Sequence, residues 1–174
     1  MREHEADTEG GSTEEALEGA RNMARRLALL HMAYARTLVD ALGEEAGRAL
    51  IERAVRAYGE RIGERTRQRV EALGLEPTPA NFGAGADLPR ALFPAETVEV
   101  EGEVRSRSQG CVLYDVWREY GEEELGALYC LVDPAKMEGY DPGWTMVHTR
   151  RLPLGDACCE MAVRPTGPRG ADTP

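Results

Sequence analysis

The sequence predicts an α+β fold in which two long N-terminal helices pack on a roughly four-stranded antiparallel sheet, with one further helix. Three observations support this prediction. Apolar residues recur at helical spacing as far as Gly74, and after Pro94 the hydrophobic period changes from helical to alternating. A third helical segment and two more alternating segments follow. Helices first and strands later are typical of an α+β domain.

The two long helices account for the first half of the chain. Ser12 or Thr13 resembles an N-cap, with acidic residues in the turn that follows. Apolar residues then recur every three or four positions to about Leu42, where Gly43 interrupts the pattern. A second apolar stripe predicts another helix that ends at Gly74.

A proline-rich loop, residues 75–95, separates these helices from the predicted sheet, and a loop of this length often covers or lines a site. A further helix is predicted over residues 122–136, because this segment begins with acidic residues. Alternating or β-branched segments predict the strands. The expected strands are residues 98–104, 111–117, 144–152 and 158–164.

A chain of 174 residues fits one domain, which we expect to span residues 12–164. Residues 1–11 are polar and acidic and are expected to be disordered. Residues 165–174 are rich in proline and glycine and are expected to form a flexible tail.

The formal charge of −10 argues against a nucleic-acid partner, which would need a basic surface. No apolar run is long enough to span a bilayer and no signal segment is visible, so we expect a cytoplasmic protein without a membrane partner. In that reducing compartment the four cysteines are expected to be thiols, ligands or nucleophiles.

The candidate site lies between Tyr129 and Cys159, where three of the four cysteines lie among carboxylates and a histidine. Such groups supply nucleophiles and proton transfer. Each also has a structural alternative: a buried cysteine is usually a small hydrophobe, an aspartate before proline or in a Gly-Asp turn is often a cap, and a mid-strand histidine is often structural. The catalytic candidates are Cys130, Asp133, His148, Asp156 and Cys159.

Two arrangements of these groups remain open. In one, His148 activates a thiolate of low pKa and a carboxylate orients it. In the other, Cys130, His148 and Cys158 or Cys159 hold a divalent metal such as zinc, although no close ligand motif is present. The expected cofactor is therefore either none or such a metal. Alternation in the last strand predicts that Cys159 is buried and that Cys158 is more exposed.

The order of Cys130, Asp133, Pro142, Leu152, Gly155-Asp156 and Cys159 resembles the C-terminal half of the L-2-amino-thiazoline-4-carboxylic acid hydrolase family. The Gly110-Cys111 and Trp117 segment and the Tyr58-Gly59-x3-Gly63 helix fit the same family. The Gly-Asp-x-x-Cys piece is also similar to the end of the 4-vinyl reductase type of small-molecule-binding domain, which shares the arrangement of helices followed by a sheet.

The first resemblance implies a hydrolase that opens a small cyclic amidine. Water adds to the amidine-like carbon of a thiazoline ring, and the carbon–sulfur bond opens to give an N-carbamoyl-cysteine. Cys159 or Cys130 would attack that carbon or hold a metal-bound hydroxide, while Asp133 or Asp156 would move the proton or fix the exocyclic amine. His148 is a candidate base.

The substrate would need further contacts. Cys111, Trp117 and Trp144 are candidates to line its pocket, and Arg150 or Arg151 is a candidate for its carboxylate, with a solvated strand arginine as the alternative. The second resemblance implies a non-catalytic module that binds a small molecule or a metal. In both cases the expected partner is a small molecule, and a homo-oligomer is compatible with the sequence.

Overall fold

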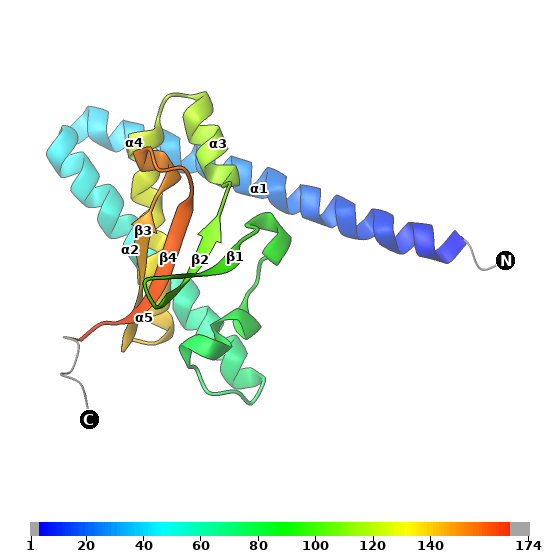
Figure 1. The fold of residues 1–174 in the computed structure, drawn as a ribbon. Coiled ribbons are helices and arrows are strands. Elements are labelled where there is room, and N and C mark those ends of the chain that lie inside the picture. The colour runs from blue at the N-terminus through cyan, green and yellow to red at the C-terminus, as the bar shows by residue number, and fades with distance from the viewer. Residues whose placement is uncertain (1–3, 168–174) are drawn as a thin grey trace.

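A computed structural model describes residues 4–167 of the chain, and of residues 4–12 only the backbone (Figure 1). The helices are α1 (His4–Leu42), α2 (Glu44–Ala72), α3 (Val112–Glu119), α4 (Glu123–Gly126) and α5 (Val132–Tyr140). The strands are β1 (Glu96–Val100), β2 (Glu103–Ser108), β3 (Trp144–Arg150) and β4 (Cys159–Pro165). Short 3-10 helices are η1 (Pro79–Gly85), η2 (Arg90–Leu92), η3 (Ala127–Leu131) and η4 (Leu152–Leu154).

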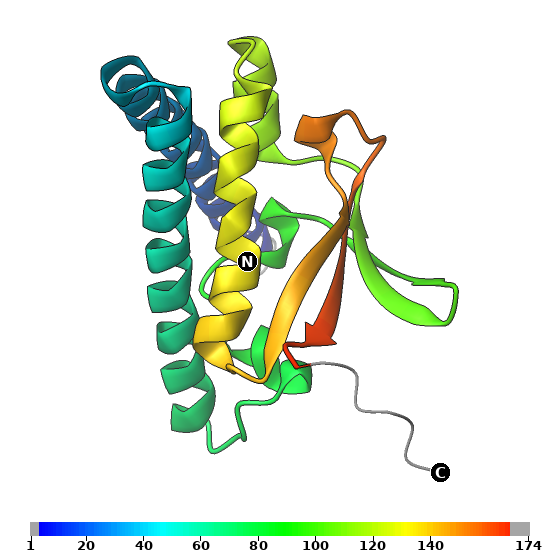
Figure 2. The same ribbon diagram turned by 90° about the vertical axis from the view of Figure 1, so that its left-hand side faces the viewer.

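The predicted α+β class is confirmed. The strands form one antiparallel sheet in the order β1-β2-β4-β3. Figure 2 shows α2, α5 and the sheet in succession, so that α5 lies between the other two. The first half of α1 extends away from this body in Figure 1. None of the described helices is long and apolar enough to cross a membrane.

Both long helices end where the sequence predicts. Gly43 has a φ of 82°, which separates α1 from α2, and α2 ends at Ala72. The start of α1 differs from the N-cap predicted at Ser12 or Thr13, because the backbone is helical from His4. Acidic residues are compatible with a helix N-terminus, where the helix dipole favours negative charge. At the other end β4 reaches Pro165, and residues 1–3 and 168–174 lie outside the described part.

The first half of the sheet corrects two predicted strands. The segment 98–104 is the centre of a hairpin, because Glu101 and Gly102 have φ values of 53° and 77° and form a two-residue turn. The polar segment after this turn is β2. The segment 111–117 is not a strand but the start of α3, since Leu113, Val116 and Trp117 lie three and four residues apart and are all buried.

The helix predicted over residues 122–136 is divided into α4, η3 and α5, and it continues to Tyr140. Pro134 lies in the first turn of α5, where its missing N–H leaves no intrahelical bond unmade. The Asp133-Pro134 pair thus begins a helix. This start fixes the direction in which the Asp133 side chain leaves the backbone.

Helices α2 and α5 are in contact through glycines. A Cβ built on Gly63 would lie 2.1 Å from the Lys136 carbonyl oxygen, and one on Gly139 would lie 2.3 Å from that of Glu60. At Gly59 the nearest atoms would be 2.8 Å away, on Val132 and Ala135. The backbones therefore approach each other more closely than any side chain permits.

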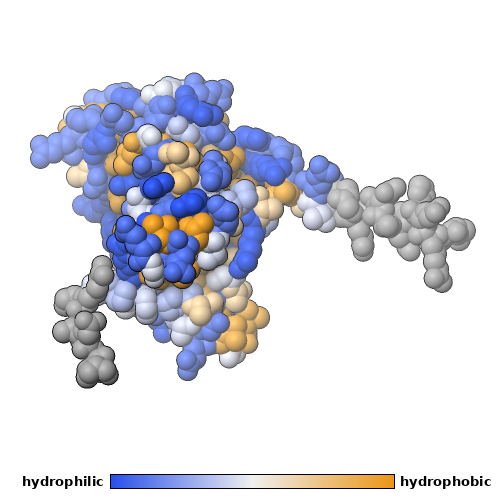
Figure 3. Space-filling model, in the orientation of Figure 1, coloured by the Kyte–Doolittle hydropathy of each residue, from blue (hydrophilic) through white to orange (hydrophobic). Residues whose placement is uncertain are grey.

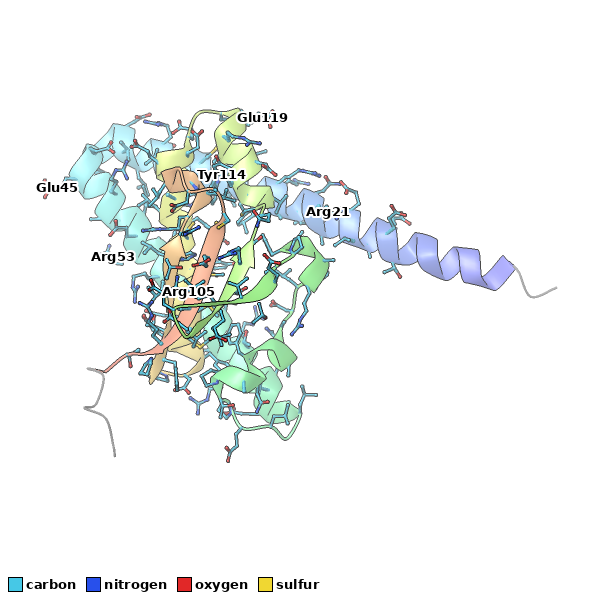
Figure 4. All side chains as sticks on the ribbon, in the orientation of Figure 1. Arg21, Glu45, Arg53, Arg105, Tyr114 and Glu119 are labelled. Carbon is cyan, nitrogen blue, oxygen red and sulfur yellow. The ribbon has the colours of Figure 1, made fainter. Side chains whose placement is uncertain are left out.

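The face of the sheet that is turned away from α5 carries a network of charges. Glu160, which is only 1% exposed, accepts hydrogen bonds from Arg105, Arg107 and Thr149 at 2.8 to 2.9 Å. Arg105 lies on this face in Figure 4, and Figure 3 shows that the same side of the molecule is largely hydrophilic around a small apolar patch. These hydrogen bonds, that with Arg105 above all, lower the pKa of Glu160 to about 2.

Candidate functional site

Asp133 and His148 lie together between α5 and β3. Nε2 of His148 is 3.3 Å from Oδ2 of Asp133, and Nζ of Lys136 is 3.0 Å from the other carboxylate oxygen. Burial alone would raise the pKa of Asp133, but Lys136 and His148 outweigh it and lower that pKa to about 2. The carboxylate is therefore ionised at neutral pH.

Three of the predicted cysteines surround this pair. Cys111 is the residue before α3, Cys130 lies in η3 and Cys159 begins β4, and all three are half-buried free thiols. Burial raises the pKa of Cys130 to about 12, and the charge of Asp133 together with the nearby thiols of Cys111 and Cys159 adds to this rise. Burial likewise raises the pKa of Cys111 and of Cys159. Since Cys111 and Cys159 affect the pKa of Cys130, and Asp133 affects the pKa of all three thiols, they lie near one another and near Asp133. With raised pKa values they are protonated at neutral pH.

Cys159 has a backbone hydrogen-bond donor at its sulfur, as Cys111 does, whereas Cys130 has none among the described residues. The backbone N–H of Leu152 donates to the sulfur of Cys159 over 3.4 Å, and this bond partly opposes the rise in the pKa of Cys159. His148 is paired across the sheet with Met161. Because Cys159 is two residues from Met161, it projects from the same face of the sheet as His148. It is thus a diagonal neighbour of the imidazole.

The predicted burial of the adjacent cysteines is reversed. Cys158 is 4% exposed, whereas Cys159 is half-buried. Hydrogen bonds to Glu160 raise the pKa of Arg107 on the far face of the sheet, and the nearby Cys158 adds to that rise. The prediction failed because it took the apolar face of β4 as the covered one, whereas the charged network covers the other.

The loop between β3 and β4 holds the remaining predicted polar residues. Asp156 is exposed, and its Oδ2 accepts a hydrogen bond of 2.7 Å from the backbone N–H of Arg151. The side chain of Asp156 therefore closes the turn around η4. Arg150 is exposed at the end of β3, whereas Arg151 is half-buried and lowers the pKa of Cys130.

The two tryptophans are in different places. Trp117 belongs to the buried cluster against which Cys111 and Cys130 pack, and its Nε1 has no hydrogen-bond partner among the described residues. Trp144 instead packs at the other end of α5, with Val70 and Tyr140. Only Trp117 is therefore near the cysteines.

Among the described residues, no group of three or more His, Cys, Asp or Glu side chains is arranged to hold a metal ion. The four ligands considered from the sequence are Cys130, His148, Cys158 and Cys159. Cys158 lies near Arg107, on the face of the sheet that is turned away from α5. The site as it stands is a set of thiols beside an aspartate–histidine pair.

Sequence reasoning missed three residues of this site. Lys136 binds Asp133 from the next turn of the same helix. Its spacing of three residues from Asp133, and its being the only lysine of the chain, were signals that could have identified it. Burial raises the pKa of Tyr129, and Tyr58 and Asp133 raise it further, so both tyrosines line the same region. No local pattern distinguishes them from core residues.

His31 supports the aromatic side of the site. Its Nε2 is 3.0 Å from the carbonyl oxygen of Leu125, to which it donates, and burial lowers the pKa of His31. The ring lies edge-on to Tyr129, with centroids 5.3 Å apart. A neutral histidine thus joins α1 to the segment that carries Cys130.

The family comparison agrees with this arrangement. Residues 21–163 match the model of the L-2-amino-thiazoline-4-carboxylic acid hydrolase family, and the matched range includes all of the site residues described above. No curated protein and no solved structure gives a significant match. Because the match covers most of the sequence, the chain belongs to the L-2-amino-thiazoline-4-carboxylic acid hydrolase family.

Proposed function

We propose that the protein hydrolyses a small cyclic amidine of the thiazoline type, with Cys159 as nucleophile, His148 as general base and Asp133 as the group that orients His148. The observation that carries this proposal is the 3.3 Å contact between Asp133 and His148 beside the thiols. A nucleophile, a base and an orienting carboxylate are the three parts of an activated-nucleophile site. The family match supports the same reaction class.

Asp133 is better suited to orient His148 than to shuttle a proton. Its pKa of about 2 leaves it ionised at neutral pH, so it has no proton to give. When it accepts the Nε2–H of His148, the second ring nitrogen is left as the proton acceptor. The carboxylate then stabilises the imidazolium that forms as His148 takes a proton.

Cys159 is the preferred nucleophile among the three thiols. It shares a face of the sheet with His148, and the Leu152 N–H at its sulfur favours negative charge there. Cys130 has no such donor among the described groups, and its pKa of about 12 makes its thiolate the costlier one. The raised pKa of Cys159 means that the base must remove its proton during attack.

The reaction balances with one molecule of water. The sulfur of Cys159 bonds to the amidine carbon while His148 takes the thiol proton. The ring carbon–sulfur bond then breaks, and the leaving thiolate receives that proton. Water next attacks the same carbon, with His148 again as the base, and expels the Cys159 thiolate, which regains a proton. The product carries a new urea group and a free thiol.

The test is turnover of 2-amino-thiazoline-4-carboxylate by the purified protein, followed by mass spectrometry as a gain of one water. Cys159→Ala and His148→Gln should each abolish turnover. Cys158→Ala is the matched control, because that thiol lies near Arg107 on the opposite face of the sheet. When the reaction of the wild type is quenched at early times, mass spectrometry should find the substrate bonded to Cys159. Full activity of Cys159→Ala would sink the nucleophile assignment.

The alternative from the sequence, a non-catalytic module for small molecules or metals, makes an opposite prediction. Metal analysis of the purified protein would then find a stoichiometric ion whose retention requires Cys130 and Cys159, and no thiazoline would be opened. Turnover that is unchanged by chelator treatment is the result expected under our proposal.

A further inference from the structure

Arg151 lies beside the thiol site, and three hydrogen bonds hold its backbone. Its N–H donates to Asp156 over 2.7 Å, and its carbonyl accepts bonds from Leu154 and Asp156. The next residue, Leu152, donates its N–H to the sulfur of Cys159. The arginine is therefore one residue from a direct contact with the proposed nucleophile.

The guanidinium of Arg151 makes no ion pair or side-chain hydrogen bond with any described side chain. This distinguishes it from the remaining half-buried arginines, each of which pairs with a carboxylate of the chain. Those paired arginines are Arg21, Arg48, Arg56, Arg69, Arg105, Arg107 and Arg164. A partly desolvated cation without a partner is unfavourable, so its position indicates a group that comes from outside the chain.

The chemistry of such a partner is restricted. A guanidinium has five donors in a planar fork and matches a carboxylate through two parallel hydrogen bonds. Cys130 lies near Arg151, but burial raises the pKa of this thiol to about 12 although the charge of Arg151 opposes the rise. The thiol is therefore too weak an acid to supply a permanent negative charge. An anionic substituent on the bound small molecule would supply it.

We infer that Arg151 is a specificity-determining residue that binds the carboxylate of the substrate, so that the site selects cyclic amidines carrying an acid group on the ring. This inference rests on the proposed function and names the residue that would select its substrate. Arg150, the residue considered from the sequence, lies on the exposed end of β3 and is not the carboxylate ligand.

The experiment compares two substrates, 2-amino-thiazoline-4-carboxylate and 2-amino-thiazoline without the acid, on wild type, Arg151→Gln, Arg151→Lys and Arg150→Gln. The wild type should prefer the acid, and Arg151→Gln should lose about 10- to 100-fold in kcat/KM for it, mainly through KM. Its kcat/KM for the uncharged ring should fall by far less than its kcat/KM for the acid. Arg151→Lys should recover part of the loss, and Arg150→Gln should behave as wild type.

Binding separates this inference from the proposed function. In a Cys159→Ala background the dissociation constant of 2-amino-thiazoline-4-carboxylate is measured by calorimetry with and without Arg151→Gln. Arg151-dependent binding without any turnover by the wild type would overturn the proposed reaction and support the carboxylate site. Turnover with the same acid preference in Arg151→Gln, or binding that ignores this substitution, would overturn the inference instead.

Discussion

Lys136 and His148 hold opposite oxygens of one carboxylate, at 3.0 Å from Oδ1 and 3.3 Å from Oδ2 of Asp133. The cation comes from the next turn of α5 and the imidazole from β3. Asp133 is thus fixed from both sides, which keeps it charged and limits its rotation. The only lysine in the chain lies at this position.

Lys136→Gln should lower the free energy of unfolding at neutral pH and make it depend less on pH below about pH 4. Asp133 has a folded pKa of about 2, below its ordinary value, so its ionised form stabilises the fold above about pH 4, and this contribution is lost as the pH falls toward 2. Without Lys136 that pKa rises, so the ionised carboxylate stabilises the fold less at neutral pH and less stability is lost on acidification. Urea unfolding between pH 2 and pH 7 measures it. Arg67→Gln, which removes an exposed pair with Glu71, should leave the pH profile unchanged.

Asp133→Asn should reduce kcat/KM by about 10²- to 10⁴-fold, because the amide no longer stabilises the imidazolium of His148. Steady-state rates on the thiazoline acid across pH check this. Asp115→Asn, an exposed residue of α3, is the control for a lost negative charge. A rate within twofold of wild type would remove Asp133 from the mechanism.

Alkylation should distinguish the cysteines. Cys159 is half-buried and Cys158 is buried, so iodoacetamide should label Cys159 before Cys158. Since burial raises the pKa of Cys159, labelling should be slow at pH 7 and faster at pH 9. Peptide mass spectrometry after timed labelling gives both rates. Faster labelling of Cys158 would mean that the far face of the sheet is open in solution.

Gly63→Ala should destabilise the fold by about 1–3 kcal/mol, the usual cost of overpacking a core. The new methyl would lie 2.1 Å from the Lys136 carbonyl oxygen, which is backbone and cannot turn aside. The midpoint of urea unfolding measures the change. Gly19→Ala is the matched helix control, because open space surrounds that position and alanine favours a helix. Equal midpoints for the two variants would contradict the close contact.

Much of the fold could be predicted because it follows from local patterns. The ends of α1 and α2 near Gly43 and Gly74 follow from glycine at helix termini, and β3 and β4 from alternation. The sheet has four strands as predicted, but two of the predicted strands were assigned to the wrong residues. The Glu101-Gly102 turn lay inside an apparently regular alternation, and α3 contains the β-branched and aromatic residues that also favour strands.

The candidate site was predictable only in part. Its cysteines, Asp133 and His148 could be named because their side chains carry reactive groups. Which face of β4 is covered depended on Glu160 and two arginines of β2, whose pairing spans more than fifty residues. The sequence does not show where each tryptophan packs: tertiary structure places Trp117 near the cysteines and Trp144 beside Tyr140.

The glycine contact between α2 and α5 limits how this scaffold could be adapted. Since α5 already rests backbone against backbone on α2, it has no room to retreat from the sheet and admit a bulkier ring. Enlarging the substrate range would therefore have to proceed through the η4 turn. There Leu154 is exposed, so its side chain can be changed without disturbing the contact between α2 and α5.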